Sequence, residues 1–170
     1  ADDSSASTSS VYGIWINPRS QFAQLTQITT PQGGTTSVAY TTAQKQNSTN
    51  VTPYVVPVVE SVTTNDDNDT IGTTTYQYFD ADYYYASTID RRFAGFGTVI
   101  ETQSDGDIIT SKYHQGNGES ANESTDGYSK IGKIYEKTVE DSENNLFQLE
   151  RFTYTDATLG IGASSSLLTS

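Results

Sequence analysis

Three segments of the sequence repeat the same spacing between a turn residue and an aromatic residue. The spacing is seven residues in each case, from Gly33 to Tyr40, from Gly106 to Tyr113 and from Asn145 to Phe152. Gly and Asn accept the positive φ that tight turns need, and β-prone residues flank each turn, so each segment predicts a β-hairpin. A hairpin cannot bury its own apolar face. We therefore expect these units to stack on one another or on other chains.

The composition favours the same class of fold. Hydrophobic residues make up only 34% of the 170 residues, but twelve Tyr and six Phe supply large buried areas per side chain. Thr, Tyr and Val suit a pleated, half-buried surface, and strong helix formers are scarce. We predict an all-β fold of antiparallel hairpins in a curved sheet or sandwich, with an extended N-terminal strand arm.

The hairpins are expected at residues 22–40, 97–113 and 131–154. Between the first two, residues 41–50 are polar and predict a loop. The following run, residues 51–59, is apolar but contains Pro53 and Pro57, which cannot donate to a strand ladder. This run therefore predicts an edge or crossing segment rather than a central strand. A further strand is expected at residues 73–79, leading into Tyr83-Tyr84-Tyr85.

The N-terminus combines a low-complexity stretch with an apolar one. Residues 1–10 are rich in Ser and Thr, and the next six residues are apolar on both faces of a strand and include the only Trp of the chain. A strand of this kind needs cover on both sides and is suited to adding to the sheet of a neighbour. We predict an arm or donor strand at residues 1–16, a β domain at 17–158 and a tail at 159–170. The predicted assembly residues of the arm are Val11, Tyr12, Ile14, Trp15 and Ile16.

Charge and residue usage exclude several classes of function. The net charge is −12, and all of it falls on residues 60–170, because residues 1–59 hold two acids and two bases. Such a surface repels a phosphate backbone, so we expect no nucleic-acid partner. No run approaches the roughly 20 apolar residues of a membrane span. The chain has no Cys and begins Ala-Asp-Asp-Ser-Ser, which favours a secreted protein, extracellular or at the cell surface.

Candidate sites for a ligand or for catalysis are few. Asp66, Asp67 and Asp69 offer oxygen ligands for Ca²⁺, but a solvated acidic turn is the favoured interpretation. We expect no other cofactor. The single His114 cannot form a multi-histidine metal site, and no nucleophile–base pair is evident. The Tyr83–Tyr85 cluster suits either sugar stacking or, as we favour, a cross-strand ladder of stacked tyrosines. We therefore expect no enzymatic activity.

Two segments in the second half of the chain carry a family signature. They read Arg92-Phe93-Ala94-Gly95-Phe96-Gly97 and Tyr113-His114-Gln115-Gly116. Together with the YD-type run from Leu25 to Tyr40, they resemble RHS/YD-repeat shell proteins, such as the B component of insecticidal Tc toxins and plasmid-virulence B proteins. The resemblance covers about residues 22–155. Its motif residues here are Arg92, Phe93, Gly95, Phe96, Gly97, Tyr113, His114, Gln115 and Gly116.

The resemblance implies a β-sheet wall that encloses a toxic payload. Family shells are much longer than this chain, and the self-cleaving aspartyl site that ends them has no counterpart at this C-terminus. Our first hypothesis is therefore a non-enzymatic extracellular structural subunit that self-assembles into a filament or surface layer by strand addition and sheet stacking. The alternatives are a fragment of a Tc B-like shell, with the rest of that shell as partner, and a carbohydrate-binding adhesin.

Overall fold

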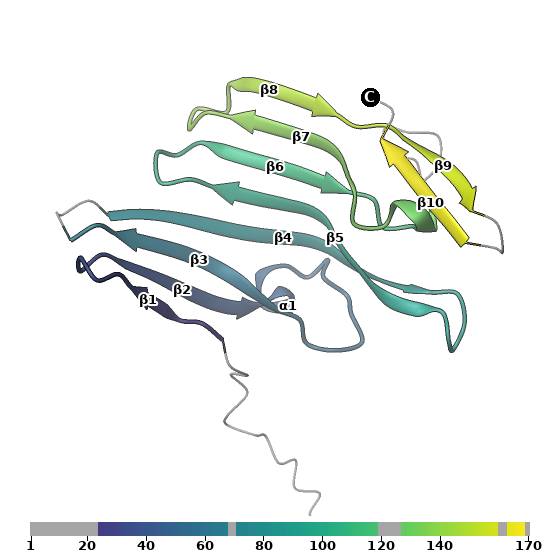
Figure 1. Cartoon of the computed structure of the whole chain (residues 1–170), viewed down its shortest axis with the longest axis horizontal. Coiled ribbons are helices and arrows are strands. Elements are labelled where there is room, and N and C mark those ends of the chain that lie inside the picture. Colours follow the sequence, from purple (N-terminus) through teal and green to yellow (C-terminus); the bar gives the residue numbers. More distant parts are fainter. Residues whose placement is uncertain (1–23, 68–70, 119–126, 160–162, 169–170) are drawn as a thin grey trace, which may run out of the picture.

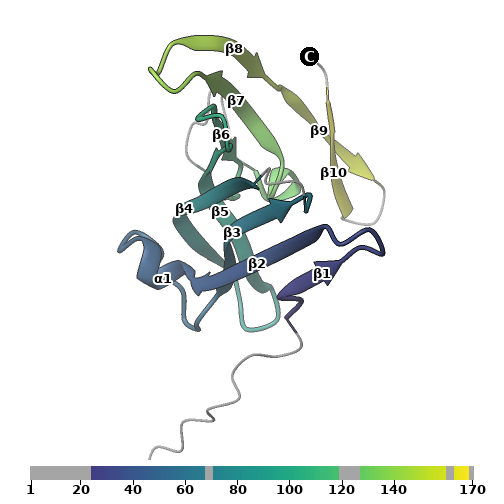
Figure 2. The same ribbon diagram turned by 90° about the vertical axis from the view of Figure 1, so that its left-hand side faces the viewer.

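The structure is a computed structural model that describes residues 24–67, 71–118, 127–159 and 163–168. Eight antiparallel strands form one open sheet in chain order, and two more form a separate hairpin (Figure 1). The all-β class is therefore confirmed, and the sheet is strongly twisted and curved (Figure 2). The strands are β1 (Gln27–Thr29), β2 (Thr35–Thr42), β3 (Pro57–Asn65), β4 (Ile71–Tyr85), β5 (Arg91–Thr102), β6 (Ile108–Tyr113), β7 (Ile134–Glu140), β8 (Leu146–Arg151), β9 (Tyr154–Leu159) and β10 (Ala163–Leu168). Two short helical elements, α1 (Ala43–Gln46) and the 3-10 turn η1 (Tyr128–Lys130), lie between strands.

The three predicted hairpins are present, and their tips share one geometry. The first tip residue donates its N–H to the carbonyl four residues later, over 2.8 Å from Thr30, 2.8 Å from Gln103 and 3.0 Å from Asp141. The fourth tip residue has positive φ, 97° at Gly33, 95° at Gly106 and 64° at Asn144. This is the pattern of a short hairpin loop whose last residue is left-handed.

The predicted register is wrong by one residue in the third hairpin. Its left-handed residue is Asn144 rather than Asn145, and the seventh residue after Asn144 is Arg151. In the other two hairpins the closing Tyr follows a β-bulge directly, between Ala39 and Tyr40 and between Lys112 and Tyr113. The aromatic thus closes a strand where the ladder shifts its register.

The segment before β3 also differs from the prediction. Residues 51–56 do cross between elements, but Pro57 begins a strand that lies inside the sheet, between β2 and β4. A proline is tolerated there because it is the first residue of its strand. The ladder of β3 with β4 runs only from Ser61 to Asn65, whereas β4 continues to Tyr85.

Side chains from residues 41–50, the predicted loop, form hydrogen bonds to the backbone of β4 in the part that β3 does not pair with. Gln46 bonds the backbone of Tyr76 and Tyr78 over 2.9 and 3.2 Å. Asn50 donates to the Tyr78 carbonyl over 2.8 Å and accepts from the Ala81 N–H over 2.9 Å. Two amide side chains therefore act as a short substitute strand along the exposed edge of β4, and α1 holds them in place.

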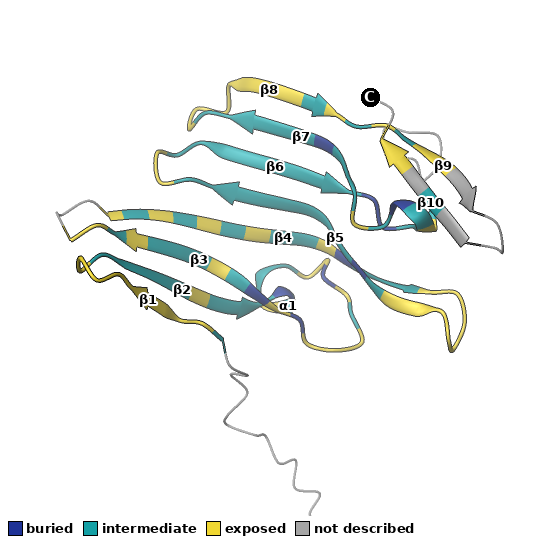
Figure 3. Cartoon of the chain, viewed as in Figure 1, coloured by how far each residue is buried: buried dark blue, intermediate teal, exposed yellow. Residues whose placement is uncertain are grey.

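The apolar core is small and lies on one side of this arrangement. Among the described residues the buried apolar side chains are Ala43, Val56, Val58, Ala81 and Ala94. Tyr78, Phe93 and Phe96 pack against the cluster formed by the first three. Figure 3 places most of the buried positions around α1, the start of β3 and the bend of β4 and β5, while β6 and β8 are half-buried or exposed.

The last two strands form a two-stranded sheet of their own. β9 and β10 pair from Tyr154 with Leu168 to Leu159 with Ala163. The hairpin lies beside η1, which β10 contacts (Figure 1). The predicted arm, residues 1–16, lies outside the described residues. The division into arm, domain and tail stays a prediction.

Candidate functional site: the motif junction and the outer edge

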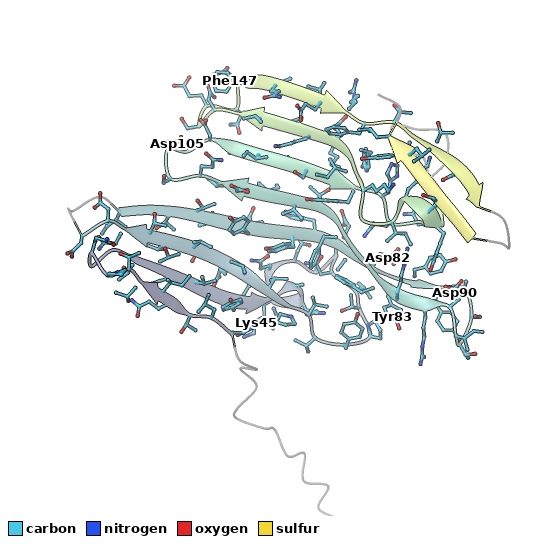
Figure 4. The ribbon with its side chains drawn as sticks, viewed as in Figure 1. Lys45, Asp82, Tyr83, Asp90, Asp105 and Phe147 are labelled. Carbon is cyan, nitrogen blue, oxygen red and sulfur yellow. The ribbon has the colours of Figure 1, made fainter. Side chains whose placement is uncertain are left out.

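The first motif segment forms the bend of β5. Asp82 pairs with Gly95 and Tyr83 with Phe93, so Ala94 is the extra residue of a β-bulge. Ala94 is buried, and Gly95 has a φ of 92°. Figure 4 labels Asp82 and Tyr83 on the neighbouring part of β4. The glycine permits a backbone conformation that bends the strand and increases its twist.

The second motif segment meets this bend through one side chain. Gln115, which follows β6, donates its side-chain amide to the carbonyls of Asp80 and Gly95. Asp80 is itself left-handed, with a φ of 56°. A Cβ added to Gly97 would approach Gln115 Oε1 to 3.1 Å, so this glycine leaves space for the amide. Gln115 therefore joins two irregular backbone sites that the ladder of β4 and β5 leaves open.

In the second motif segment, the backbone of His114 connects the end of β6 to the residues that precede β7. The backbone of His114 accepts from the Gly132 N–H over 2.8 Å and donates to the Lys133 carbonyl over 2.9 Å. Its ring is fully buried, with the rings of Tyr135 and Tyr154 at centroid distances of 5.1 and 5.8 Å. His114 thus connects the sheet to the β9–β10 hairpin. The structural role of His114 remains a prediction.

Aromatic rings extend the junction across both sides of the bend. On one side a chain of ring contacts runs from Tyr83 through Tyr54, Phe93 and Phe96 to Tyr78, at centroid distances of 5.9, 6.5, 5.4 and 4.8 Å. Elsewhere Arg92 lies 4.2 Å from the ring centroid of Tyr128, and Tyr84 packs on the same ring at 4.9 Å. Tyr83 therefore packs on Tyr54, in the segment before β3, and Tyr84 packs on Tyr128 in η1, so the described ring contacts of this pair are not a cross-strand ladder.

The predicted motif residues are thus brought together into one structural joint, which we call the motif junction. Its members are Arg92, Phe93, Gly95, Phe96, Gly97, Tyr113, His114, Gln115 and Gly116. The described contacts are hydrogen bonds between backbone groups, side-chain hydrogen bonds from Gln115 to the backbone, ring packing and one cation–π contact. Contacts of these kinds fix strand directions and twist.

A family model described as "Insecticide toxin TcdB middle/N-terminal region" matches residues 15–120, which include both motif segments. This chain belongs to that family. The match covers more than half of the chain and confirms the resemblance to the Tc toxin B component. No curated protein and no solved structure gives a match.

The TcdB-family sheet also carries a row of charges across three strands, which begins at Lys112 within the matched residues and continues beyond them to Glu136 and Arg151. Glu136 on β7 bonds Lys112 on β6 over 2.8 Å and Arg151 on β8 over 3.1 Å. These residues are direct cross-strand partners, so their side chains share one face of the sheet. The hydrogen bond to Glu136 raises the pKa of Lys112 above its ordinary value. Glu136 is buried, although the side chains of Lys112 and Arg151 are 41% and 60% exposed.

The outer edge of β8 is the feature that sequence reasoning missed. Leu146, Phe147 and Leu149 are 55%, 68% and 43% exposed, and β8 has no partner on its outer side in the described part of the chain. Figure 4 labels Phe147 at this edge. The run Leu-Phe-Gln-Leu is apolar at three of four positions, which departs from the alternation of a strand with one solvated face. This run of apolar residues is the sequence signal from which the exposed apolar edge could have been predicted.

The remaining predicted sites stay untested. The arm residues Val11, Tyr12, Ile14, Trp15 and Ile16 lie outside the described residues, as does Asp69. Asp67 is a turn residue with a φ of 67°, and its N–H donates to Asn65 Oδ1 over 2.8 Å. Within the described ranges no group of three acidic, His or Cys side chains is placed to hold a metal ion. The calcium site at Asp66, Asp67 and Asp69 remains a prediction.

Proposed function

We propose that this TcdB-family chain is a non-enzymatic wall segment of a toxin-enclosing β-shell. The observation that carries the proposal is that β6, in the middle of the β5–β8 half of the sheet, is half-buried at all six positions. Successive residues of a strand point to opposite faces, so neither face of this strand is fully covered. A sheet that is one layer thick and open on both sides is suited to separating two compartments.

The small core supports the same proposal. Only five apolar side chains of the described residues are buried, and three of them belong to the cover formed by α1 and the start of β3. A compact domain normally closes its core with a second layer of strands or helices. Strands added at the edges and material against the faces would supply what this sheet lacks. Those neighbours belong to the rest of a larger shell or to further copies of the chain.

Location and chemistry follow from the same proposal. An insecticide toxin family supports release from the producing cell, so we place the wall segment outside it. In the described residues no helix is long and apolar enough to cross a membrane. A wall needs no catalytic group and no cofactor. A calcium ion at the tip between β3 and β4 would add only local stability.

The experiment that tests the proposal is electron cryomicroscopy of the product of the complete gene. We expect a hollow particle whose wall contains β5–β8, with one face of the sheet toward the enclosed space. A solid particle in which both faces of this sheet pack against folded domains would contradict the proposal. A gene that encodes a signal peptide directly before Ala1 and a stop codon soon after Ser170 would require further copies of the chain, rather than the rest of a longer chain, to complete the wall.

Hydrogen exchange gives a second measure in the same proteins. In the isolated chain, the amides of β6 and β7 should exchange faster than those of the paired part of β3 and β4. In the complete particle, the amides of β7 and β8 should become protected. Unchanged exchange of β8 would show that no strand is added to it.

A further inference from the structure

The two edges of the eight-stranded sheet are built differently. β1, at one edge, is three residues long, and a very short edge strand is a common protection against unwanted strand pairing. β8, at the other edge, is six residues long, contains neither Lys nor Pro, and carries its two charged residues, Glu150 and Arg151, only at its C-terminal end. Its outer side carries a row of backbone groups next to exposed apolar side chains. The edge at β8 is therefore the one suited to accept a strand.

The side chains of β8 define what such a strand must look like. Leu146 and Leu149 share one face of the sheet, because their partners Glu140 and Thr138 are two residues apart on β7. Phe147 is the extra residue of a β-bulge between these pairs. The edge of β8, which would be the acceptor of an added strand, is thus apolar at its N-terminal end. At its C-terminal end Arg151 is already bonded to Glu136.

One segment of this chain has the matching chemistry. Val11–Ile16 is six residues long, uncharged, and apolar on both faces of a strand. Most of the chain carries a strong negative charge, which opposes general self-association. Contact between copies therefore favours segments that are locally uncharged, as Val11–Ile16 and Leu146–Leu149 both are. Strand addition would bury these apolar side chains and pair the outer backbone groups of β8.

We propose that the outer edge of β8 binds Val11–Ile16 of a second copy of the chain. The proposal depends on the wall function in one respect, namely that the edges of the sheet accept further strands. Within one copy, seven strand spacings of about 4.8 Å place β8 roughly 34 Å along the sheet from β1. Ile16 and Gln24 are eight residues apart and span at most about 28 Å. A donor from a second copy has no such limit.

The consequence is an assembly that grows from head to tail. Each copy carries one donor segment, Val11–Ile16, and one acceptor, the outer edge of β8. Such a contact gives a closed dimer or ring where the geometry closes, and a filament where it does not. Trp15 is the only Trp of the chain and lies within the donor, so its fluorescence reports directly on donor binding.

The test uses the full chain and three single variants. Phe147→Thr damages the acceptor and keeps a β-prone residue, and Trp15→Lys damages the donor. Ile89→Thr is the matched control, because Ile89 is 95% exposed and lies in the turn between β4 and β5. Far-UV circular dichroism checks that each variant keeps its sheet. Light scattering after size exclusion gives the mass, and the emission of Trp15 gives its burial.

We expect the wild type and Ile89→Thr to form species of two or more copies with a blue-shifted Trp15 emission. Phe147→Thr should be monomeric with a red-shifted emission, and Trp15→Lys should be monomeric. A mixture of the two damaged variants should form a one-to-one complex, because one supplies an intact donor and the other an intact acceptor. The emission of the mixture, which comes only from the Phe147→Thr copy, should shift to the blue.

Several results would overturn the proposal. A wild type that is monomeric at all concentrations with a red-shifted Trp15 would show that the donor binds nowhere. A monomer whose blue-shifted emission is lost in Phe147→Thr would show that the segment binds its own copy. Assembly that survives Trp15→Lys would assign β8 to another occupant, and a mixture that fails to combine would exclude exchange between copies. None of these outcomes decides the wall function, which the complete gene product tests separately.

Discussion

The two halves of the sheet bury different sets of side chains. Among the described residues, the half that α1 covers buries five apolar side chains, which fall between Ala43 and Ala94, together with Asn50. In the half from the motif junction to β8, the buried residues are polar: His114, Gln115, Lys130 and Glu136. The strand sequences of the halves are nevertheless similar, with Thr, Val, Ile and Tyr in both. In the described part of the chain, the difference lies in the segment from Ala43 to Val58, which packs against rings of β4 and β5.

The two halves are therefore stabilised by different interactions, apolar burial in one and polar contacts in the other. The covered half has an apolar cluster that stabilises it without further partners, and its free energy of unfolding depends on burial. The half from the motif junction to β8, which we call the bare half, is held by hydrogen bonds, ion pairs and ring contacts around a few buried polar groups. Such contacts fix directions well but contribute little net stability each. The bare half is accordingly the one that needs neighbours.

The largest effect should come from the amide that substitutes for a strand in the covered half. Asn50 is 3% exposed and makes three hydrogen bonds to the backbone of Ala43, Tyr78 and Ala81. Asn50→Ala leaves these buried groups without their partner, so we expect a loss of about 4 kcal/mol in the free energy of unfolding. Urea denaturation measures it. Asn47→Ala, which removes a single bond to the Thr49 N–H, should cost less than about 1 kcal/mol. Equal losses would refute the substitute-strand interpretation.

The next effect should separate packing from backbone strain in the motif junction. Gly116 and Gly95 both have positive φ, 73° and 92°. A Cβ on Gly116 would lie 2.6 Å from Ile131 Cγ1, whereas a Cβ on Gly95 would have no neighbour within 4 Å. We expect Gly116→Ala to cost about 3 kcal/mol and Gly95→Ala about 1 kcal/mol. Thermal or urea unfolding compares the two. A larger loss at Gly95 would show that the junction is fixed by strain rather than by close packing.

Local chemistry made part of this structure predictable. The tips at Gly33 and Gly106 follow from residues that accept positive φ, and a turn needs no information from elsewhere in the chain. The order and the strand character of the motif segments were also evident. The off-by-one register at Asn144 arose because both Asn144 and Asn145 suit a left-handed position, and the sequence alone does not choose between them.

Long-range contacts account for what was missed. Gln46 and Asn50 read as loop residues, because their partners on β4 lie about thirty positions further along the chain. Gln115 reaches Asp80 and Gly95 only because both strands are irregular there. Pro57 can begin a strand inside the sheet because the ladder of β3 with β4 starts only at Ser61, so no N–H is needed from Pro57 toward β4. No periodicity within a strand encodes contacts of this kind.

In the bare half, the ion row should contribute less than either site above. Glu136→Gln keeps the shape of the side chain and removes its charge beside Lys112 and Arg151. Both partners are more than a third exposed, so water screens the interaction and we expect a loss of about 1 kcal/mol. The pKa of Lys112 is raised by its bond to Glu136, so this contribution is complete below the ordinary Lys value of 10.5 and is lost as pH rises through the higher folded value. Urea denaturation at low and high salt measures it, with Glu143→Gln as control. A loss that does not shrink in high salt would mean that the row acts through packing.

The smallest effect should lie at the tip between β7 and β8 and depend on acid. Hydrogen bonds from the side chain and backbone N–H of Asn145 lower the pKa of Asp141 below its ordinary value of 3.8. A carboxyl with a lowered folded pKa stabilises the fold above its unfolded pKa, and the contribution is lost as pH falls through the folded value. Wild type should therefore exceed Asp141→Asn in urea midpoint at neutral pH, and the gap should close below pH 3.8. Asn145→Ala removes the main donor, so it should move the carboxyl titration of Asp141, followed by NMR, back toward that ordinary value. If the titration stays where it was, the tip is held by its backbone alone, and β8 is positioned without help from this pair.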